Sequence, residues 1–133
     1  MTYALDSDTI SYLLNKDHKT QNNFKLAVDR GEEYVIPPIV FYEVKRWLQL
    51  KNAKVKLAAF VNLCTFTNKI VMDNACWEKA IEIYTTLIKK GAPIDDGDIF
   101  IAAYCIVNDY TLVTNNTGHF ERINGLNSVN WKD

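Results

Sequence analysis

Short apolar runs alternate along the chain with longer segments in which apolar residues return every three or four positions. The first pattern predicts buried strands, and the second predicts helices that pack one face on a core. Strands are expected at 2–5, 34–36, 69–72 and 111–114, and Val129 is expected to begin a short fifth. Helices are expected at 8–15, at 19–30, after the pair Pro37-Pro38, at 53–65, from Asp73 to Lys90, and at 96–108.

The apolar spacing also predicts which side of each helix faces the core, and nearby polar residues predict where helices begin. Ser7 or Asp8 is expected to cap the first helix, and Asp73 the long one. The expected inward positions are Ile10, Leu13 and Leu14; Phe24, Ala27 and Val28; Val40, Val44, Trp47 and Leu48; and Cys76, Ala80, Ile83 and Leu87.

Strands separated by helices at these intervals indicate right-handed crossover connections. The expected fold class is α/β, with three layers: a central, mostly parallel sheet of four to five short strands and helices on both faces. In such a sheet, groups at the carboxyl ends of the strands meet in one crevice. The residues that follow strands are therefore the first candidates for a functional site.

Composition agrees with a compact protein and narrows its class. The chain has 133 residues, 48% hydrophobic and 23% charged, which is typical of one domain over residues 1–133 and unlike a disordered chain. The net charge of −1 does not indicate a polyanionic partner, although one face can still be basic. No apolar run reaches the about 18 residues of a membrane span, and no signal peptide is visible. The expected location is the cytoplasm, with no membrane association.

The cysteines agree with that location. Cys64, Cys76 and Cys105 are odd in number, and their spacing fits neither a disulfide framework nor a zinc knuckle. Each lies among apolar neighbours, so we expect small buried side chains in a reducing compartment.

Three carboxylates occupy positions where we expect side chains to meet in the crevice at the carboxyl ends of the strands. Asp6 follows the first strand, Glu43 lies in the first turns of the helix after the second strand, and Asp98 opens the helix before the strand at 111–114. Asp95 and Asp96 add further negative charge beside Asp98. Like charges this close repel unless a cation lies between them, and oxygen-only ligands favour Mg²⁺ or Mn²⁺. Such a site is suited to phosphodiester chemistry.

Taken singly, each acid also has an ordinary explanation. Asp6 alone is read as an N-cap, Asp98 as a first-turn acid facing the helix dipole, and Glu43 as the partner of Lys45 or Arg46. The three together form the pattern that favours a shared site.

The sequence resembles the PIN-domain ribonucleases of the VapC toxin type. The resemblance rests on Leu5-Asp6-Ser7-Asp8 with Ile10 to Leu14, on Ile39 to Glu43, on Asp98 to Ala103, and on Leu112 to Ile123 with Gly125-Leu126 and Asn130-Trp131. These motifs occur in order over essentially the whole chain. The resemblance implies a Mg²⁺- or Mn²⁺-dependent endoribonuclease that cuts tRNA or another structured RNA. It also implies a homodimer, open to further assembly, held inactive by a cognate VapB-like antitoxin.

The same resemblance assigns roles to individual positions. Asp6, Glu43 and Asp98 match the metal-binding acids, and Thr114 matches a hydroxyl residue that orders the site. The fourth acidic position is replaced: Asn116 and His119 stand where relatives have an acid, and Asn116 can still offer a carbonyl oxygen. Asp8 stands where relatives commonly have Asn, which suggests the hypothesis that it restores the missing charge.

His119 has two interpretations from sequence. It can donate a proton to the leaving oxygen, or it can simply cap a turn or contact phosphate. His18, in a polar loop, is expected to be solvated surface.

Two surfaces are candidates for partners. Five basic residues close behind Glu43 form either a solvated helix face or a track for an RNA backbone: Lys45, Arg46, Lys51, Lys54 and Lys56. Tyr42 and Trp47 are interleaved with them at a spacing that suits core or dimer contacts better than base stacking. The resemblance further implies that an antitoxin segment lies on Ile10, Tyr12, Leu13 and Leu14 and on the helix at 53–65.

Two other functions remain open. Asp6-Ser7-Asp8-Thr9 resembles the start of haloacid-dehalogenase-type phosphatases, but Ile10 departs from that signature and Glu43 is left unexplained. The second alternative is a PIN fold with weakened catalysis that binds RNA or an antitoxin, because the fourth acid is missing.

Overall fold

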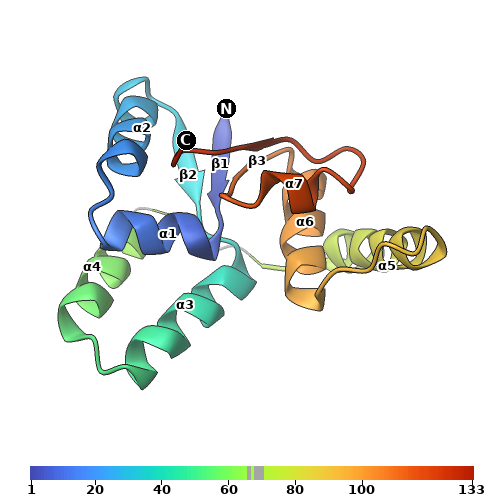
Figure 1. Ribbon diagram of the computed structural model, residues 1–133, viewed down its shortest axis with the longest axis horizontal. Helices are drawn as coiled ribbons and strands as arrows, with labels where there is room; N and C mark the ends of the chain where they lie inside the picture. Colours follow the sequence, from blue (N-terminus) through green and yellow to red (C-terminus); the bar gives the residue numbers. More distant parts are fainter. Residues whose placement is uncertain (66, 68–70) are drawn as a thin grey trace.

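A parallel sheet forms the centre of the molecule (Figure 1). The computed structural model describes residues 1–65, 67 and 71–133. Within these residues the strands are β1 (Thr2–Leu5), β2 (Glu33–Val35), β3 (Thr111–Val113) and β4 (Ser128–Val129). They lie in the order β2-β1-β3-β4, and every neighbouring pair is parallel. The expected α/β class and parallel sheet are confirmed.

Helices lie on either side of the sheet. They are α1 (Ser7–Leu14), α2 (His18–Asp29), α3 (Pro38–Leu50), α4 (Lys54–Thr65), α5 (Asn74–Lys89), α6 (Asp96–Asn108) and the short α7 (Thr117–Phe120). In the view of Figure 1, α1 to α4 lie to the left of β1 and below it, whereas α5 and α6 lie to the right. Among the described helices, none is long and apolar enough to cross a membrane.

The strand order brings the carboxyl ends of the strands to one edge. Leu5, the last residue of β1, pairs with Val113, the last residue of β3. The next backbone N–H, that of Asp6, donates to the carbonyl of Val113 at 3.0 Å. Val129 pairs with Val113 from the other side. The residues that follow β1, β3 and β4 therefore stand next to one another.

The predicted apolar stripes form the core, with two exceptions. Ile10, the inward positions of α5, and Val40, Val44 and Leu48 of α3 are buried. The predictions for Val28 and Trp47 are wrong: these side chains are 47% and 57% exposed. Each stands next to a buried residue of its helix, Ala27 or Leu48, and one step along a helix turns the side chain by about 100° away from the core.

Three further differences from the expected elements concern local detail. Asp6 caps α1, in place of Ser7 or Asp8. Helix α7 was not expected, because it is only one turn long. Of the strand expected at 69–72, residues 69 and 70 lie outside the described part of the chain, and Val71 and Met72 are not in a strand.

Candidate active site

Asp6 is held at the end of β1 by a buried pair of hydrogen bonds. Its side chain is the N-cap of α1: Oδ1 accepts from the backbone N–H of Ser7 at 2.7 Å. Its other oxygen, Oδ2, accepts from the hydroxyl of Thr114 at 2.8 Å. Asp6 is only 8% exposed and Thr114 is fully buried. The carboxylate is therefore fixed between the first helix and the residue after β3.

Thr114 and the loop behind it connect Asp6 to Asp8. The Thr114 hydroxyl lies 3.4 Å from Oδ2 of Asp8, and this same oxygen accepts from the backbone N–H of Asn115 at 3.0 Å. Thr9, also buried, donates its hydroxyl to the carbonyl of Val113 at 2.9 Å. The start of α1 is thus bound to the carboxyl end of β3 by side chains, and both acids lie at this junction.

Glu43 reaches the same region from α3. Its Oε1 accepts from the hydroxyl of Ser7 at 3.0 Å, one residue beyond Asp6. A Cβ atom placed on Gly97 would lie only 3.3 Å from Oε2 of Glu43. Because Gly97 has no side chain, the first turn of α6 can come this close to Glu43. The carboxylate of α3 therefore lies between the first turns of α1 and α6.

Asp98 stands in that first turn of α6 and is bound to His119. Nε2 of His119 lies 3.0 Å from Oδ2 of Asp98, and the two side chains are 23% and 29% exposed. Phe120, next in the chain, is buried and anchors α7 at the site. The sequence suggested a turn, a phosphate or the leaving oxygen as the partner of His119, and the structure gives it a carboxylate.

Burial raises the pKa of three acids, Asp6, Asp8 and Asp98, and repulsion from other acids adds to it for Asp6 and Asp98. Burial, then the charge of Asp8, raises the pKa of Asp6 to about 7, against the opposing bonds from Thr114 and Ser7. Burial also raises the pKa of Asp8 and of Asp98. The charge of Asp8 contributes to the raised pKa of Asp98, and that of Asp98 to the raised pKa of Asp6. The acids from α1 and α6 therefore share one electrostatic environment.

This donor set fits a hard divalent cation. Asp6, Asp8, Glu43 and Asp98 all offer carboxylate oxygens, the ligands that hard divalent cations prefer. For Asp6 and Asp98 the neighbouring acids also raise the free energy of the ionised state, which a cation would lower. Within residues 1–65, 67 and 71–133, no three acidic, histidine or cysteine side chains are already gathered as a metal cage. The carboxylates are instead bonded to Ser7, Thr114 and His119.

Asn116 lies beside the acids but differs from them. Its backbone N–H donates to the Thr114 hydroxyl at 3.1 Å, and its exposed side chain does not cap α7. Asp95 and Asp96 are exposed, so of the three acids grouped at the start of α6 only Asp98 is half-buried.

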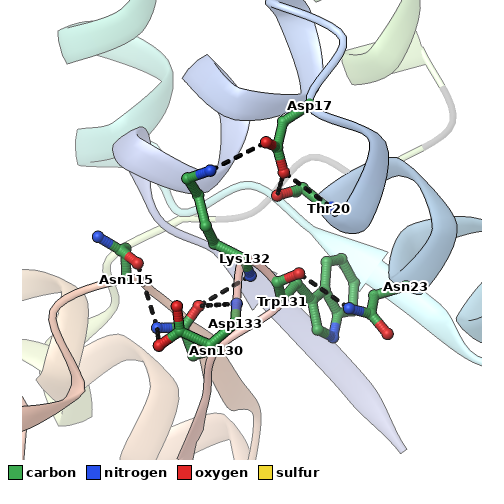
Figure 2. Close-up of polar contacts among 8 residues, drawn as sticks. All are labelled: Asp17, Thr20, Asn23, Asn115, Asn130, Trp131, Lys132 and Asp133. Atoms are coloured by element: carbon green, nitrogen blue, oxygen red, sulfur yellow. Dashed lines mark hydrogen bonds and ion pairs between the residues drawn. The ribbon is translucent and has the colours of Figure 1, made fainter.

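The C-terminal tail supports the loop after β3, as Figure 2 shows. Nδ2 of Asn130 donates to Oδ1 of Asn115 at 3.1 Å, and the backbone of Asn115 in turn holds Asp8. Lys132 pairs with Asp17 at 2.9 Å, and Asn23 donates to the carbonyl of Trp131 at 2.8 Å. The sequence analysis gave Asn130 no role, although its position directly after β4 places it at the carboxyl edge.

A cavity of about 330 Å³ opens beside the acids. Asp8 and Glu43 line it together with residues of α1, α3 and α4, among them Trp47 and Lys56. The site thus continues from the carboxylates into a hollow between helices.

The model of the PIN domain matches residues 3–126. The chain belongs to the PIN-domain family. This assignment excludes the phosphatase interpretation of Asp6 and Asp8, because that signature belongs to a different fold.

Two relatives that match over nearly their whole length carry ribonuclease names. Ribonuclease VapC2 of Rickettsia felis is 29% identical over 132 residues, covering 98% of each chain. Ribonuclease VapC1 of Haemophilus influenzae strain R2866 is 26% identical over 144 residues, again covering 98% of each chain.

Solved structures share the fold over nearly the whole length of the chain. The chain matches the structure of VapBC2 from Rickettsia felis, bound to a DNA fragment from their promoter, with a TM-score of 0.86 and 29% identity, covering 98% of this chain and 99% of that one. It matches DNA-bound VapBC from Salmonella typhimurium with a TM-score of 0.87 over 98% of both chains, where 24% identity shows the fold alone.

Proposed function

We propose that this protein is a Mg²⁺- or Mn²⁺-dependent endoribonuclease of the VapC type. It hydrolyses phosphodiester bonds of tRNA or another structured RNA and is the toxin of a type II toxin–antitoxin pair. The observation that carries the proposal is that four carboxylates, those of Asp6, Asp8, Glu43 and Asp98, border the carboxyl edge of a PIN-family sheet around the first turns of α1 and α6. The ribonuclease names of full-length relatives support it.

Asp6, Glu43 and Asp98 are the proposed ligands of the ion, and Asn116 is proposed to offer its carbonyl oxygen nearby. A bound divalent ion would lower the pKa of a water molecule and offset the negative charge of the transition state. The rest of the arrangement keeps the carboxylates in place. Thr114 holds Asp6, Ser7 holds Glu43, and His119 holds Asp98.

The proposed protein partner is a VapB-like antitoxin, with which this chain forms an inhibited complex. The support comes from the similarity to chains of VapBC complexes over nearly the full length. A homodimer is the proposed form of the toxin.

A second candidate function is a PIN module that binds RNA or antitoxin but cuts weakly. The observation that favours it is the replacement of the fourth acid, since Asn116 carries no charge and His119 is engaged with Asp98. Asp8 speaks against this second candidate. It lies beside Asp6 and supplies a further carboxylate at the site, which is what the hypothesis that Asp8 restores the missing charge requires.

The test is cleavage of a small-RNA pool by purified protein. Reactions contain Mn²⁺ or EDTA, and the variants are Asp6→Ala and Asp98→Asn, with Glu82→Gln as a surface control in an exposed pair with Lys79. We expect discrete products with Mn²⁺ from the wild type and the control only. Products that persist in EDTA or in Asp6→Ala would contradict the proposal. The absence of both products and metal binding would favour the binding module.

A further inference from the structure

The cavity beside the acids combines features that suit a flat, partly polar ligand. Its apolar lining comes from Leu14, Val44 and Leu48. Its polar lining includes Ser11 and Asn15, which lie together, with Nδ2 of Asn15 3.4 Å from Oγ of Ser11. A volume of about 330 Å³ falls within the range of pockets that hold small ligands.

An exposed tryptophan forms part of the lining. Trp47 is 57% exposed, although the inward side of α3 is already filled by Val44 and Leu48. Nζ of Lys51 lies 4.6 Å from the centre of its ring. Tyr42 of the same helix is also exposed and paired with a cation, Arg46, so the feature that distinguishes Trp47 is its place in the cavity lining. Exposed aromatic rings are the platforms on which nucleic-acid bases stack.

The charge around the cavity fits a polyanion. Residues 44–65 contain five basic residues and no acid, in a chain whose net charge is −1. One of the five, Lys56, lines the cavity itself, opposite in charge to Asp8 and Glu43 at its acidic end. An RNA strand with one phosphate at the acids would come close to these basic side chains where it continues toward α4.

We propose that this cavity is a subsite for the base of a nucleotide next to the phosphate that is cut. The base stacks on Trp47, Ser11 and Asn15 contact its polar edge, and Lys56 binds the adjoining phosphate. Because a base can enter only when it is unstacked, the bound strand is single-stranded at this point. This inference rests on the proposed nuclease function and adds where the substrate is held.

The test compares two aromatic side chains of one helix. Trp47→Leu removes the ring at the cavity. Tyr42→Leu is the matched control: Tyr42 is 56% exposed and stacked with Arg46 at 4.8 Å, but it does not line the cavity. Fluorescence anisotropy measures the binding of labelled oligoribonucleotides of about ten nucleotides and of an abasic strand of equal length. All proteins carry Asp98→Asn so that the RNA stays intact.

We expect Trp47→Leu to weaken binding of the base-containing strands about tenfold and to leave the abasic strand within about twofold. Tyr42→Leu should change neither by more than about twofold. Lys56→Gln should weaken both strands and reduce the slope of log affinity against log salt by about 0.7. Circular dichroism confirms that each variant is folded.

Equal affinities of Trp47→Leu and Tyr42→Leu for the base-containing strands would overturn the subsite. So would an equal loss for the abasic strand, or a change in self-association with RNA binding unchanged. The nuclease proposal is judged separately by cleavage. Cleavage with no effect of Trp47 refutes the subsite alone. A Trp47 effect without cleavage refutes the nuclease and, with it, the position of the base next to a cut phosphate, and leaves a cavity that binds RNA bases.

Discussion

Among single residues, Asp6 shows the strongest conflict between burial and charge. Its carboxyl is 8% exposed and its pKa is raised to about 7, first by burial and then by Asp8. The folded state therefore binds a proton that the unfolded chain releases near pH 4. Stability from this group is complete below the unfolded pKa and is lost as the pH rises through about 7.

Asp6→Asn tests this conflict in metal-free protein. We expect the variant to melt at a higher temperature than the wild type, with a difference that grows to about 5–10 °C between about pH 5 and 8. The reason is that Asn carries no charge to bury. Thermal denaturation in EDTA measures the difference. A gap that stays constant over this pH range would show that Asp6 is not the titrating group.

His119→Gln tests the bond to Asp98. The charge and hydrogen bond of His119 lower the pKa of Asp98, against the burial that raises it. Without the imidazole, protons should compete better for Asp98, and Mn²⁺ affinity should fall about three- to tenfold near pH 6, with a smaller loss near pH 8. Calorimetric titration at both values gives the comparison. A loss that does not depend on pH would contradict this role.

The sequence predicted the positions of Asp6 and Asp98 but not their contacts. The position of Asp6 follows from the rule that side chains at the carboxyl ends of parallel strands meet. Asp98 does not follow a strand directly: it lies in the first turn of α6, the helix between α5 and β3. The bond between His119 and Asp98 depends on how α7 turns, and a single helical turn leaves no periodic pattern to read. The need for a glycine at position 97 could not be predicted either, because it depends on the close approach of Glu43 in the folded chain.

At the scale of elements, the short segment after β4 secures the edge on which the site is built. Trp131 is buried against Tyr3 and Phe24, with ring centres 5.2 and 6.0 Å away. Asn130 and Lys132 extend from it in different directions, toward the loop at Asn115 and toward Asp17. The tail therefore has one contact with the site and one with the helices behind it.

Two variants separate these contacts. Asn130→Ala should weaken Mn²⁺ binding about two- to fivefold, because Asn115 then holds Asp8 less firmly. Lys132→Ala should lower the melting temperature slightly and leave Mn²⁺ affinity unchanged, because its pair with Asp17 lies away from the acids. Calorimetry and thermal denaturation on both variants provide the readouts. Equal effects on Mn²⁺ binding would show that the tail acts only through general stability.

The buried face of a helix could be predicted from the sequence where the apolar pattern repeats over several turns. The prediction was wrong for residues at the border of the apolar face. The spacing of Cys76, Ala80, Ile83 and Leu87 identified the buried face of α5 over its whole length. Trp47 was assigned inward because apolar character alone does not separate the centre of a stripe from its border. Its exposure, 57%, is the observation from which the base subsite was inferred.

At the scale of the whole molecule, an apolar stripe on α5 is the surface that best suits the proposed homodimer. Trp77, Ile81, Tyr84 and Ile88 recur along one side of the helix and are 44–58% exposed. Exposed apolar patches of this kind mark protein interfaces. The resemblance to the VapC type implies a homodimer, and this stripe is the surface we assign to it.

Ile81→Lys is expected to convert the proposed dimer to a monomer, because it places a charge within the stripe. Val55→Lys, at a residue of α4 that is 85% exposed, is the control and should leave the dimer intact. Sedimentation velocity measures the mass of each. A monomeric wild type, or an Ile81→Lys protein that remains dimeric, would refute this interface.

The central claim is that the acids gathered at the carboxyl edge of the sheet bind a divalent ion. Calorimetric titration of Mn²⁺ near neutral pH tests it most directly, with wild type, Asp6→Asn and the surface control Glu82→Gln. The account predicts saturable binding to wild type and control and a loss of at least about tenfold in Asp6→Asn. No binding to the folded wild type, or equal binding to Asp6→Asn, would contradict it.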